Sequence, residues 1–432
     1  MPSLFSFKED QQNGKYTAGI YWLLLLYICS LFLKSSPVVS NVFIAAITVL
    51  AFFNCSPKNY AAQFTKNKVN LGFILFFFLQ VISLFYSSDS STGFQVLSLR
   101  APVFLLPLAF ALINFEKRTW NTIAVFYAFA TTIASVAGFV YSVFLTIKTK
   151  DTGYLYNDNV SDLLLGKQAV YFAFYVNSAV FIFISFLLNP DEKFKKIKGL
   201  FYLSIGWLCF ICFLLASKTA MLSLLLISLV LLFSRFIQRK KWMELSLVLF
   251  SLSIGCVILS KMFPKTLSRF TGLTQTEFQF DNAQRENHFN AAYDSTKWNS
   301  TNTRVAIWQC AKELIQQQPV FGSGLGDKKA DLLQKYKEKN FIYGYSTEKN
   351  THSQYLDIVI SMGIVGLMVF VFVFVLYPVL IFIKQKQFLA LSIFALLAFC
   401  FLTENMLDRY QGEIIIGLLL PLSAKVFEDS TD

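Results

Sequence analysis

Charged side chains are scarce in this chain of 432 residues, and their scarcity excludes an ordinary soluble globular protein. Asp, Glu, Lys and Arg make up 15% of the residues, whereas soluble proteins carry roughly 25%. The mean hydropathy is +0.53, and Phe alone occurs 48 times. We therefore expect a membrane protein, because helices that span a bilayer consist mostly of apolar residues.

Metal-binding and disulfide patterns are also missing. The sequence contains no Asp-x-Asp pair, no His-Glu-x-x-His motif and no Cys/His cluster with the spacing of metal ligands. The 7 cysteines lie mostly in or beside apolar stretches, and only Cys310 lies in a hydrophilic loop. A disulfide framework is therefore not expected, and neither is a metal or another cofactor.

Long apolar stretches recur along the chain, each close to the roughly 20 residues that a helix needs to cross a hydrocarbon core. We predict an all-α membrane protein with about twelve transmembrane helices and one large outer loop. The predicted spans cover residues 17–34, 38–55, 69–86, 93–114, 120–147, 168–188, 199–216, 219–236, 242–261, 355–383, 387–403 and 411–427.

The distribution of Lys and Arg predicts the orientation of these helices. Basic residues concentrate in one set of alternate connections, for example 193–198 and 235–241, as is typical of cytoplasmic loops. Both termini are therefore expected in the cytoplasm and the loop outside. The net charge of +12 is then largely a topology signal, and nucleic acid is not expected as a partner.

This orientation divides the chain into three predicted parts. Residues 1–261 form an N-terminal bundle of about nine spans, and residues 355–432 add about three more. Residues 262–354 form an outer loop domain with short helices, since so long a segment is seldom a passive connection. In this loop, Asn302 or Thr303 is expected to cap a first helix, and a second helix is expected over 328–339.

A glycine-rich turn separates the two predicted loop helices. Gly322, Gly324 and Gly326 follow Pro319 at short intervals. Such a pattern could be mistaken for a nucleotide-binding loop, but no strand precedes it. A tight turn that allows another backbone to approach closely is the better interpretation.

The two histidines are candidates for proton transfer, because histidine is the side chain whose unperturbed pKa suits it near neutral pH. His288 lies in a polar stretch rich in Asn, Gln and Thr. His352 lies directly before the span predicted over 355–383, at the outer membrane surface, and is the stronger candidate. The alternative is that His352 has no catalytic role and only forms a hydrogen bond to a neighbouring loop at the membrane surface.

Four cations are assigned to the same membrane face as His352. They are Arg100 inside a span that enters from outside, Lys218 in a tight outer hairpin, Arg304 at the start of the first loop helix and Arg409 in the last outer connection. Each alone could simply reach towards water. Together they suit an anionic headgroup such as a phosphate or diphosphate.

The C-terminal half also carries an ordered run of motifs. These are Arg304-x-x-x-Trp308, Pro319-x-x-Gly322-x-Gly324-x-Gly326, His352-x-x-Tyr355-Leu356 and the Gly-Ile-Val-Gly-Leu segment at 363–367. In this order and spacing the run resembles the bacterial O-antigen ligase and polymerase superfamily. Segments 214–219 and 404–412 also resemble that superfamily. Two positions depart from the family pattern: Ser353 replaces a frequent Asn, and Lys218 replaces an Arg whose planar fork lysine lacks.

The resemblance implies a ligase-like glycosyltransferase of the bacterial inner membrane, with its large loop in the periplasm. It would transfer a glycan from a polyprenyl diphosphate carrier, such as undecaprenyl diphosphate, to a sugar hydroxyl of the lipid A core, inverting the anomeric carbon without a metal. The implied roles are general base for His352, donor diphosphate binding for Arg100, Lys218, Arg304 and Arg409, and loop shaping for Trp308, Pro319 and the three glycines.

Other functions remain open from the sequence. An O-antigen polymerase would use the same donor with a second lipid-linked glycan as acceptor, and a protein O-oligosaccharyltransferase would use a protein. From a different class, a polysaccharide transporter or flippase would carry polar residues and broken helices near mid-membrane, whereas the ionisable residues here gather at one face.

Overall fold

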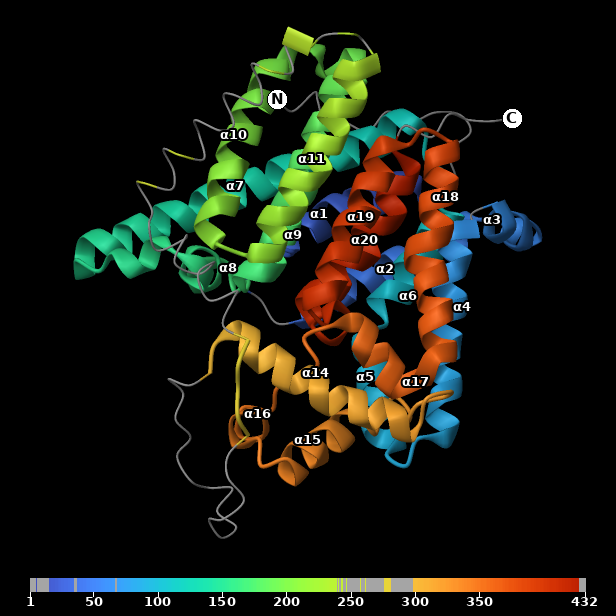
Figure 1. Ribbon diagram of the computed structural model, residues 1–432. Helices are drawn as coiled ribbons and strands as arrows, with labels where there is room; N and C mark the ends of the chain where they lie inside the picture. The colour runs from blue at the N-terminus through green and yellow to red at the C-terminus, as the bar shows by residue number, and fades with distance from the viewer. Residues whose placement is uncertain are drawn as a thin grey trace.

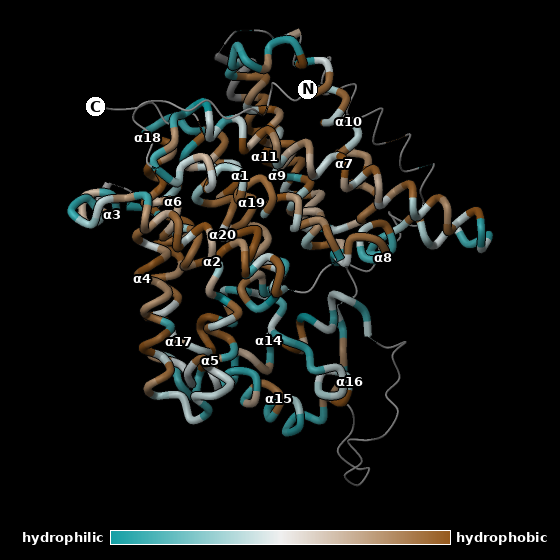
Figure 2. Tube along the Cα trace, turned by 180° about the vertical axis from the view of Figure 1, so that it is seen from behind, coloured by the Kyte–Doolittle hydropathy of each residue, from teal (hydrophilic) through white to brown (hydrophobic). Residues whose placement is uncertain are grey.

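The computed structural model describes residues 15–34, 37–66, 68–238, 276–280 and 298–426, with Phe5 and isolated positions between 240 and 261. Within these residues the structure is helical and has no strand (Figure 1). Most helices form one bundle, and α14 (Ser300–Gln317), α15 (Lys328–Glu338) and α16 (Ile342–Ser346) lie together at one end of it, here called the loop side. Figure 2 shows hydrophobic residues predominating in the bundle and hydrophilic ones in α14–α16.

Six described helices are long and apolar enough to cross a membrane, or seven if one bent pair counts as a single span. The six are α2 (Pro37–Asn54), α4 with its final turn (Lys68–Tyr86), α7 (Lys117–Thr149), α9 (Ala169–Leu188), the segment ending in α10 (Glu192–Leu215, with α10 at Lys198–Leu215) and the segment from α17 to α18 (Gln354–Lys384). The bent pair is α5 (Ser90–Leu99) and α6 (Pro102–Leu112), which meet at 45°.

The remaining helices of the bundle include α1 (Thr17–Ser30), α11 (Lys218–Gln238), α19 (Phe388–Thr403) and α20 (Tyr410–Lys425). Two short helices, α3 (Tyr60–Lys66) and α8 (Asp162–Leu165), lie in connections. A helix or helix pair stands at every predicted span except 242–261, which lies largely outside the described residues. The all-helical membrane architecture is confirmed, but the number twelve is not established.

Two helices form the centre of the bundle. In α9, 83% of the apolar window is buried, because α7, α10, α11 and α19 pack around it. Helix α20 is buried from Gly412 to Ser423 and packs against α6, α7 and α19. The connection from α19 to α20, residues 404–409, consequently reaches the loop side close to α14 (Figure 1).

The first loop helix begins earlier than predicted. Asn299 is its N-cap and accepts from the backbone N of Asn302, whose side chain accepts from the Asn299 backbone in return. The prediction of Asn302 or Thr303 as the cap was therefore wrong by about one helical turn. Buried residues of α14 and α15, among them Ile307, Cys310 and Tyr336, form a separate small core.

The helix predicted over 355–383 is not continuous. Helix α17 (Gln354–Val371) is broken at Gly363, where φ is +62° and ψ is −165°. The chain continues through a π-helical turn (Phe372–Leu376) and α18 (Tyr377–Lys384). Residues 354–362 thus form a separate short helix on the loop side, and the chain continues in a new direction after the break.

The glycine-rich turn between α14 and α15 fills this break. Four backbone hydrogen bonds join the two segments: the N–H groups of Ser323, Gly324, Ile364 and Val365 donate to the carbonyls of Ile360, Ser361, Pro319 and Val320, respectively, at 2.9–3.3 Å. Gly322 has a φ of +67°, and a Cβ there would lie 2.4 Å from the carbonyl oxygen of Ile360. A Cβ at Gly363 would lie 2.1 Å from the carbonyl oxygen of Val320, so both positions require glycine.

The same turn docks onto the connection between α4 and α5. Gly326 donates its N–H to Ser87 Oγ at 3.0 Å, and a Cβ at Gly326 would lie 1.9 Å from the carbonyl oxygen of Asp89. The Asp327 carboxylate accepts from the N–H groups of Ser88 and Asp89 at 2.6 and 2.8 Å. The loop helices are therefore fixed to two separate connections of the bundle.

Candidate active site on the loop side

Glu404, at the end of α19, lies between two of the predicted site residues. Arg304 of α14 donates from Nη2 to Glu404 Oε1 at 3.0 Å and to the Thr403 carbonyl at 3.4 Å. His352 Nδ1 lies 3.8 Å from the other carboxylate oxygen, Oε2. One carboxylate therefore orients a guanidinium and faces an imidazole, although the contact to His352 is too long for a hydrogen bond.

Lys218 approaches this cluster from α11. Its Nζ lies 3.4 Å from the Oγ of Ser300, the first residue of α14. Next to it, the Thr219 and Thr403 hydroxyls are 2.7 Å apart. Lys218, Arg304 and His352, which are far apart in the sequence, are thus brought around the same end of α19.

His352 adopts a backbone conformation that is unusual for a residue with a side chain. Its φ is +45°, which costs roughly 1–2 kcal/mol and persists only where neighbours over-determine it. Four hydrogen bonds hold the segment: His352 N–H to Asn350 Oδ1, Ser353 N–H and Thr351 Oγ1 to Asn405 Oδ1, and Trp308 Nε1 to the Thr351 carbonyl, at 2.9–3.1 Å. Nδ1 is buried on the Glu404 side, which leaves Nε2 as the ring nitrogen available to a substrate.

Arg304 keeps part of its hydrogen-bonding capacity. Its side chain is 25% exposed, and Nε is buried without a hydrogen-bond partner among the described residues. Nη1 donates to the Ser300 carbonyl at 3.2 Å. The guanidinium is therefore positioned by protein contacts but not saturated by them.

Arg100 lies in a different environment from the other predicted cations. It is 1% exposed and stands at the bend between α5 and α6. All three of its nitrogens donate to protein: Nε to the Leu407 carbonyl, Nη1 to Gln80 Oε1, and Nη2 to Asp357 Oδ2 at 3.2 Å and Asp408 Oδ1 at 2.5 Å. Four of its five N–H groups are thus taken by protein, and its burial keeps the guanidinium from direct contact with a diphosphate unless neighbouring residues move.

Lys328 completes this buried group, which we call the ion quartet (Arg100, Lys328, Asp357 and Asp408). Lys328 Nζ lies 2.6 Å from Asp357 Oδ2 and 2.7 Å from Asp408 Oδ2. Burial opposes ionisation of Asp408, but the charges of Lys328 and Arg100 outweigh it and hold the pKa of that carboxyl well below its usual range. Two cations and two carboxylates thus compensate each other, while the nearby Glu413 is buried with both oxygens unpartnered among the described residues.

Asn405 connects the two clusters. Its Oδ1 holds the His352 segment, and its Nδ2 lies 3.5 Å from Asp408 Oδ2 in the ion quartet. Arg409 follows the quartet at the start of α20 and is exposed. Arg409 thus lies in the same connection as Glu404 and Asp408, five residues after Glu404.

Several residues of the site were not assigned a role from the sequence. Glu404, Asn405 and Asp408 lie in the segment 404–412, which the sequence indicates only through the family resemblance. Lys328 and Asp357 carried no local signal at all. Within the residues that the structure describes, no three His, Cys, Asp or Glu side chains are grouped so as to hold a metal ion.

The fold and the site define a multi-pass helical membrane protein with an ionic cluster around a histidine at one face. Residues 203–371 match the family model of the O-antigen ligases. This segment runs from α10 into α17, covers less than half of the chain and contains Lys218, Arg304 and His352. The match confirms the resemblance to the O-antigen ligase and polymerase superfamily, whose members are glycosyltransferase-like enzymes of lipid-linked polysaccharides. No curated protein matches the chain.

Proposed function

We propose that this protein is an O-antigen ligase-like glycosyltransferase that moves a glycan from a polyprenyl diphosphate to a sugar hydroxyl of the lipid A core. The observation that carries the proposal is His352 at a positive φ, with Nδ1 buried 3.8 Å from Glu404 and the side chain 28% exposed. A carboxylate beside one ring nitrogen favours the tautomer in which the other nitrogen can accept a proton.

The chemical step balances without any further reactant. Nε2 of His352 takes the proton of the acceptor hydroxyl while its oxygen attacks the anomeric carbon of the donor sugar. The bond from that carbon to the diphosphate oxygen breaks, and the electron pair leaves with the polyprenyl diphosphate. Attack opposite the leaving group inverts the anomeric configuration.

The cations stabilise the charge that grows on the departing diphosphate. Arg304 and Lys218 border the cluster directly, and the exposed Arg409 lies in the same connection as Glu404. Arg100 acts on the same site by holding residues 407 and 408, and it contacts the diphosphate directly only if its protein partners rearrange. Diphosphate is a good leaving group, so no metal is required in this scheme.

Transfer with purified protein tests the proposal. The full chain in lipid nanodiscs is given a polyprenyl diphosphate oligosaccharide and lipid A core, with and without EDTA, and products are identified by mass spectrometry. Glycosylated core formed equally in EDTA is the expected result. Extension of a second lipid-linked glycan would identify a polymerase, glycosylation of added protein an oligosaccharyltransferase, and absence of any transfer would contradict the proposal.

The proposed periplasmic position of the loop has its own test. In a cysteine-free background, an impermeant reagent applied to whole cells should label a cysteine introduced at Asn340 but not one at Lys195. Labelling of the Lys195→Cys variant would show that the opposite orientation is correct, so the site would not face the periplasmic side proposed for the donor.

A further inference from the structure

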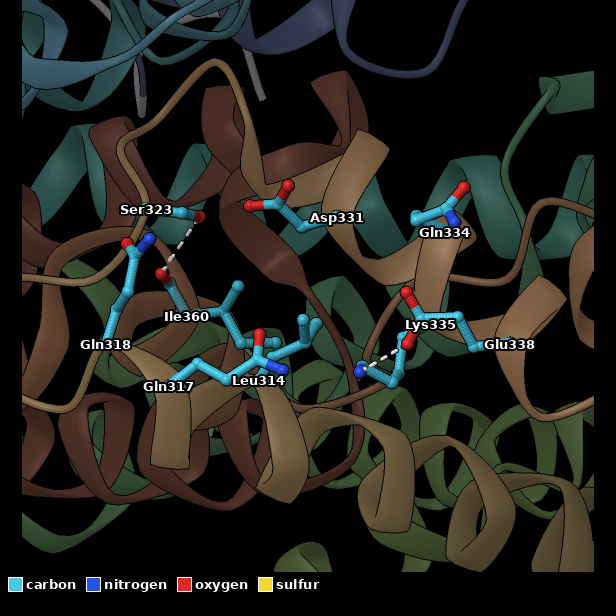
Figure 3. Close-up of a pocket in the computed structure, with 9 residues that line it drawn as sticks. All are labelled: Leu314, Gln317, Gln318, Ser323, Asp331, Gln334, Lys335, Glu338 and Ile360. Carbon is cyan, nitrogen blue, oxygen red and sulfur yellow. Dashed lines mark hydrogen bonds and ion pairs between the residues drawn. The ribbon is translucent and has the colours of Figure 1, made fainter.

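Two adjoining clefts lie at the end of α14 that is remote from Arg304. The larger, about 750 Å³, lies between the end of α4, the glycine-rich turn and α15, and the smaller, about 140 Å³, lies between α14 and α15. Gln318, Ser323 and Asp331 line both. In Figure 3, Gln318 and Asp331 extend from different elements towards Ser323. The larger cleft is of the size that small-molecule sites usually have.

The polar groups of the clefts are available for a ligand. The side chains of Gln317, Gln318 and Asp331 make no hydrogen bond within the part of the chain that the structure describes, and Ser323 Oγ makes one long contact of 3.4 Å to the Ile360 carbonyl. Together these groups supply amide donors, amide and carboxylate acceptors, and a hydroxyl that can do either. Such a set suits a ligand that carries several hydroxyl groups.

The charges of the clefts argue against an anionic ligand. Among the described residues, the only basic side chain that lines the two clefts is Lys335, which pairs with Glu338 at 2.5 Å. The Asp327 carboxylate is occupied by two backbone N–H groups, and Asp331 adds a negative charge. A phosphate or diphosphate would therefore meet carboxylates without an uncommitted cation, whereas a neutral polar ligand would not be repelled.

Aromatic rings border the larger cleft. Tyr86 is 43% exposed and Phe321 is 62% exposed, and the Tyr86 hydroxyl donates to the Phe321 carbonyl at 2.9 Å, which ties α4 to the turn. Exposed ring faces beside hydrogen-bonding groups match the two surfaces of a pyranose, apolar C–H groups on a face and hydroxyls around the edge.

We propose that these clefts form a carbohydrate groove for a neutral pyranose unit, whose hydroxyls bond Gln318, Ser323 and Asp331 and whose ring lies against Tyr86 and Phe321. The assignment rests on the proposed function for the source of the sugar, which is either the donor glycan or the acceptor saccharide. Arg304 and the groove are separated by most of α14, about 20 Å at 1.5 Å per residue. The groove thus holds a sugar other than the one that reacts.

Direct binding tests the groove without any need for transfer. The full chain, in nanodiscs free of sugar-headed detergent, is applied to an array of bacterial surface oligosaccharides, and the affinity for bound glycans is measured. Gln318→Ala and Asp331→Ala should each weaken binding about tenfold, because each removes hydrogen bonds to hydroxyls. Gln316→Ala, on the same helix but outside both clefts, should not change it.

The proposed contact between the sugar ring and the aromatic side chains has a matched control in Phe85, which is next to Tyr86 and 87% exposed. Phe321→Ala should weaken glycan binding, and Phe85→Ala should leave it unchanged. Equal effects of the two would identify the rings as membrane anchors and overturn the assignment. Absence of array binding, or binding that is the same in wild type and in the Gln318 and Asp331 variants, would overturn it as well.

The transfer assay then distinguishes the two sources of the sugar. A donor glycan in the groove predicts that Asp331→Ala raises KM for the donor about tenfold, leaving kcat and the KM of the acceptor unchanged. An acceptor saccharide predicts the reverse. Glycan binding on the array without any transfer would support the groove and contradict the proposed function. Transfer without glycan binding in the groove would support the proposed function and contradict the groove.

Discussion

The His352 cluster and the ion quartet are joined through Asn405, yet they use similar side chains in opposite ways. In the quartet, Arg100 is 1% exposed and each charge has charged partners at short distance. In the His352 cluster, Arg304 and His352 are 25% and 28% exposed and face one carboxylate, and each has a nitrogen that makes no hydrogen bond to the described residues. Saturated charges anchor a fold, whereas incompletely paired charges at an open face are available to a substrate.

Removing the imidazole should give the largest functional effect. We expect His352→Ala to lower transfer by about 10²–10⁴-fold, the usual contribution of a general base, with unfolding temperature unchanged because the side chain is partly exposed. His288→Ala is the matched control and should retain activity. Transfer by His352→Ala above about a tenth of wild type would exclude His352 as the base.

Breaking the ion quartet should lower the free energy of unfolding, and any loss of transfer activity should follow from that loss of stability. Arg100→Ala leaves Asp357 and Asp408 with one cation between them, and loss of a buried partner costs about 3–5 kcal/mol. Thermal unfolding in nanodiscs measures this loss. Lys329→Ala breaks the exposed pair with Glu348 and should cost at most about 1 kcal/mol. A stable Arg100→Ala protein without transfer activity would instead show that Arg100 contacts the diphosphate.

Removing Arg304 should instead lower the transfer rate while leaving the free energy of unfolding nearly unchanged. A charge-assisted hydrogen bond is worth about 1.5–3 kcal/mol, so Arg304→Ala should lower transfer roughly ten- to a hundredfold with little loss of stability. Arg304→Lys should recover only part of the rate, because lysine cannot make a bidentate contact. Lys312→Ala, exposed on the same helix, serves as the control; equal rates for both alanine variants would remove Arg304 from the site.

Lowering the pH should also affect the ion quartet, through a smaller change in unfolding temperature. Because the pKa of Asp408 is lowered in the folded state, its contribution to stability is present above its unfolded-state pKa of about 3.9 and is lost as pH falls below that value. The unfolding temperature of the wild type should therefore fall as the pH drops below about 4. In Asp408→Asn the starting stability should be lower and this pH dependence smaller; an unchanged slope would contradict the role given to the quartet.

The helices of the bundle could be predicted because hydrophobic runs leave few alternatives to a helix in lipid. The break at Gly363 could not, since Gly-Ile-Val-Gly-Leu reads as part of one apolar run. Only the turn that supplies its missing hydrogen bonds makes the break stable, and that turn lies some 40 residues earlier in the chain.

The candidate site divides in the same way. His352 and Lys218 could be selected because they are polar residues beside apolar stretches, and Arg304 because it opens the motif run of the loop. Their common partner Glu404 could not, since a carboxylate in a connection carries no sign of what it faces. Likewise, nothing local distinguishes Lys328, which is buried, from Lys329, which is 61% exposed.

The insertion of the glycine-rich turn into α17 also has a consequence for assembly of the protein. Within the described residues, the peptide groups next to Gly363 bond to residues 319–324, which leave the ribosome first. If the loop lies outside the membrane as proposed, residues 319–324 must already have crossed and folded when the last helices enter, or those groups would meet lipid without hydrogen bonds. In that orientation the break sets an order of assembly, because a chain whose loop folded late would hold a membrane helix with unpaired peptide groups.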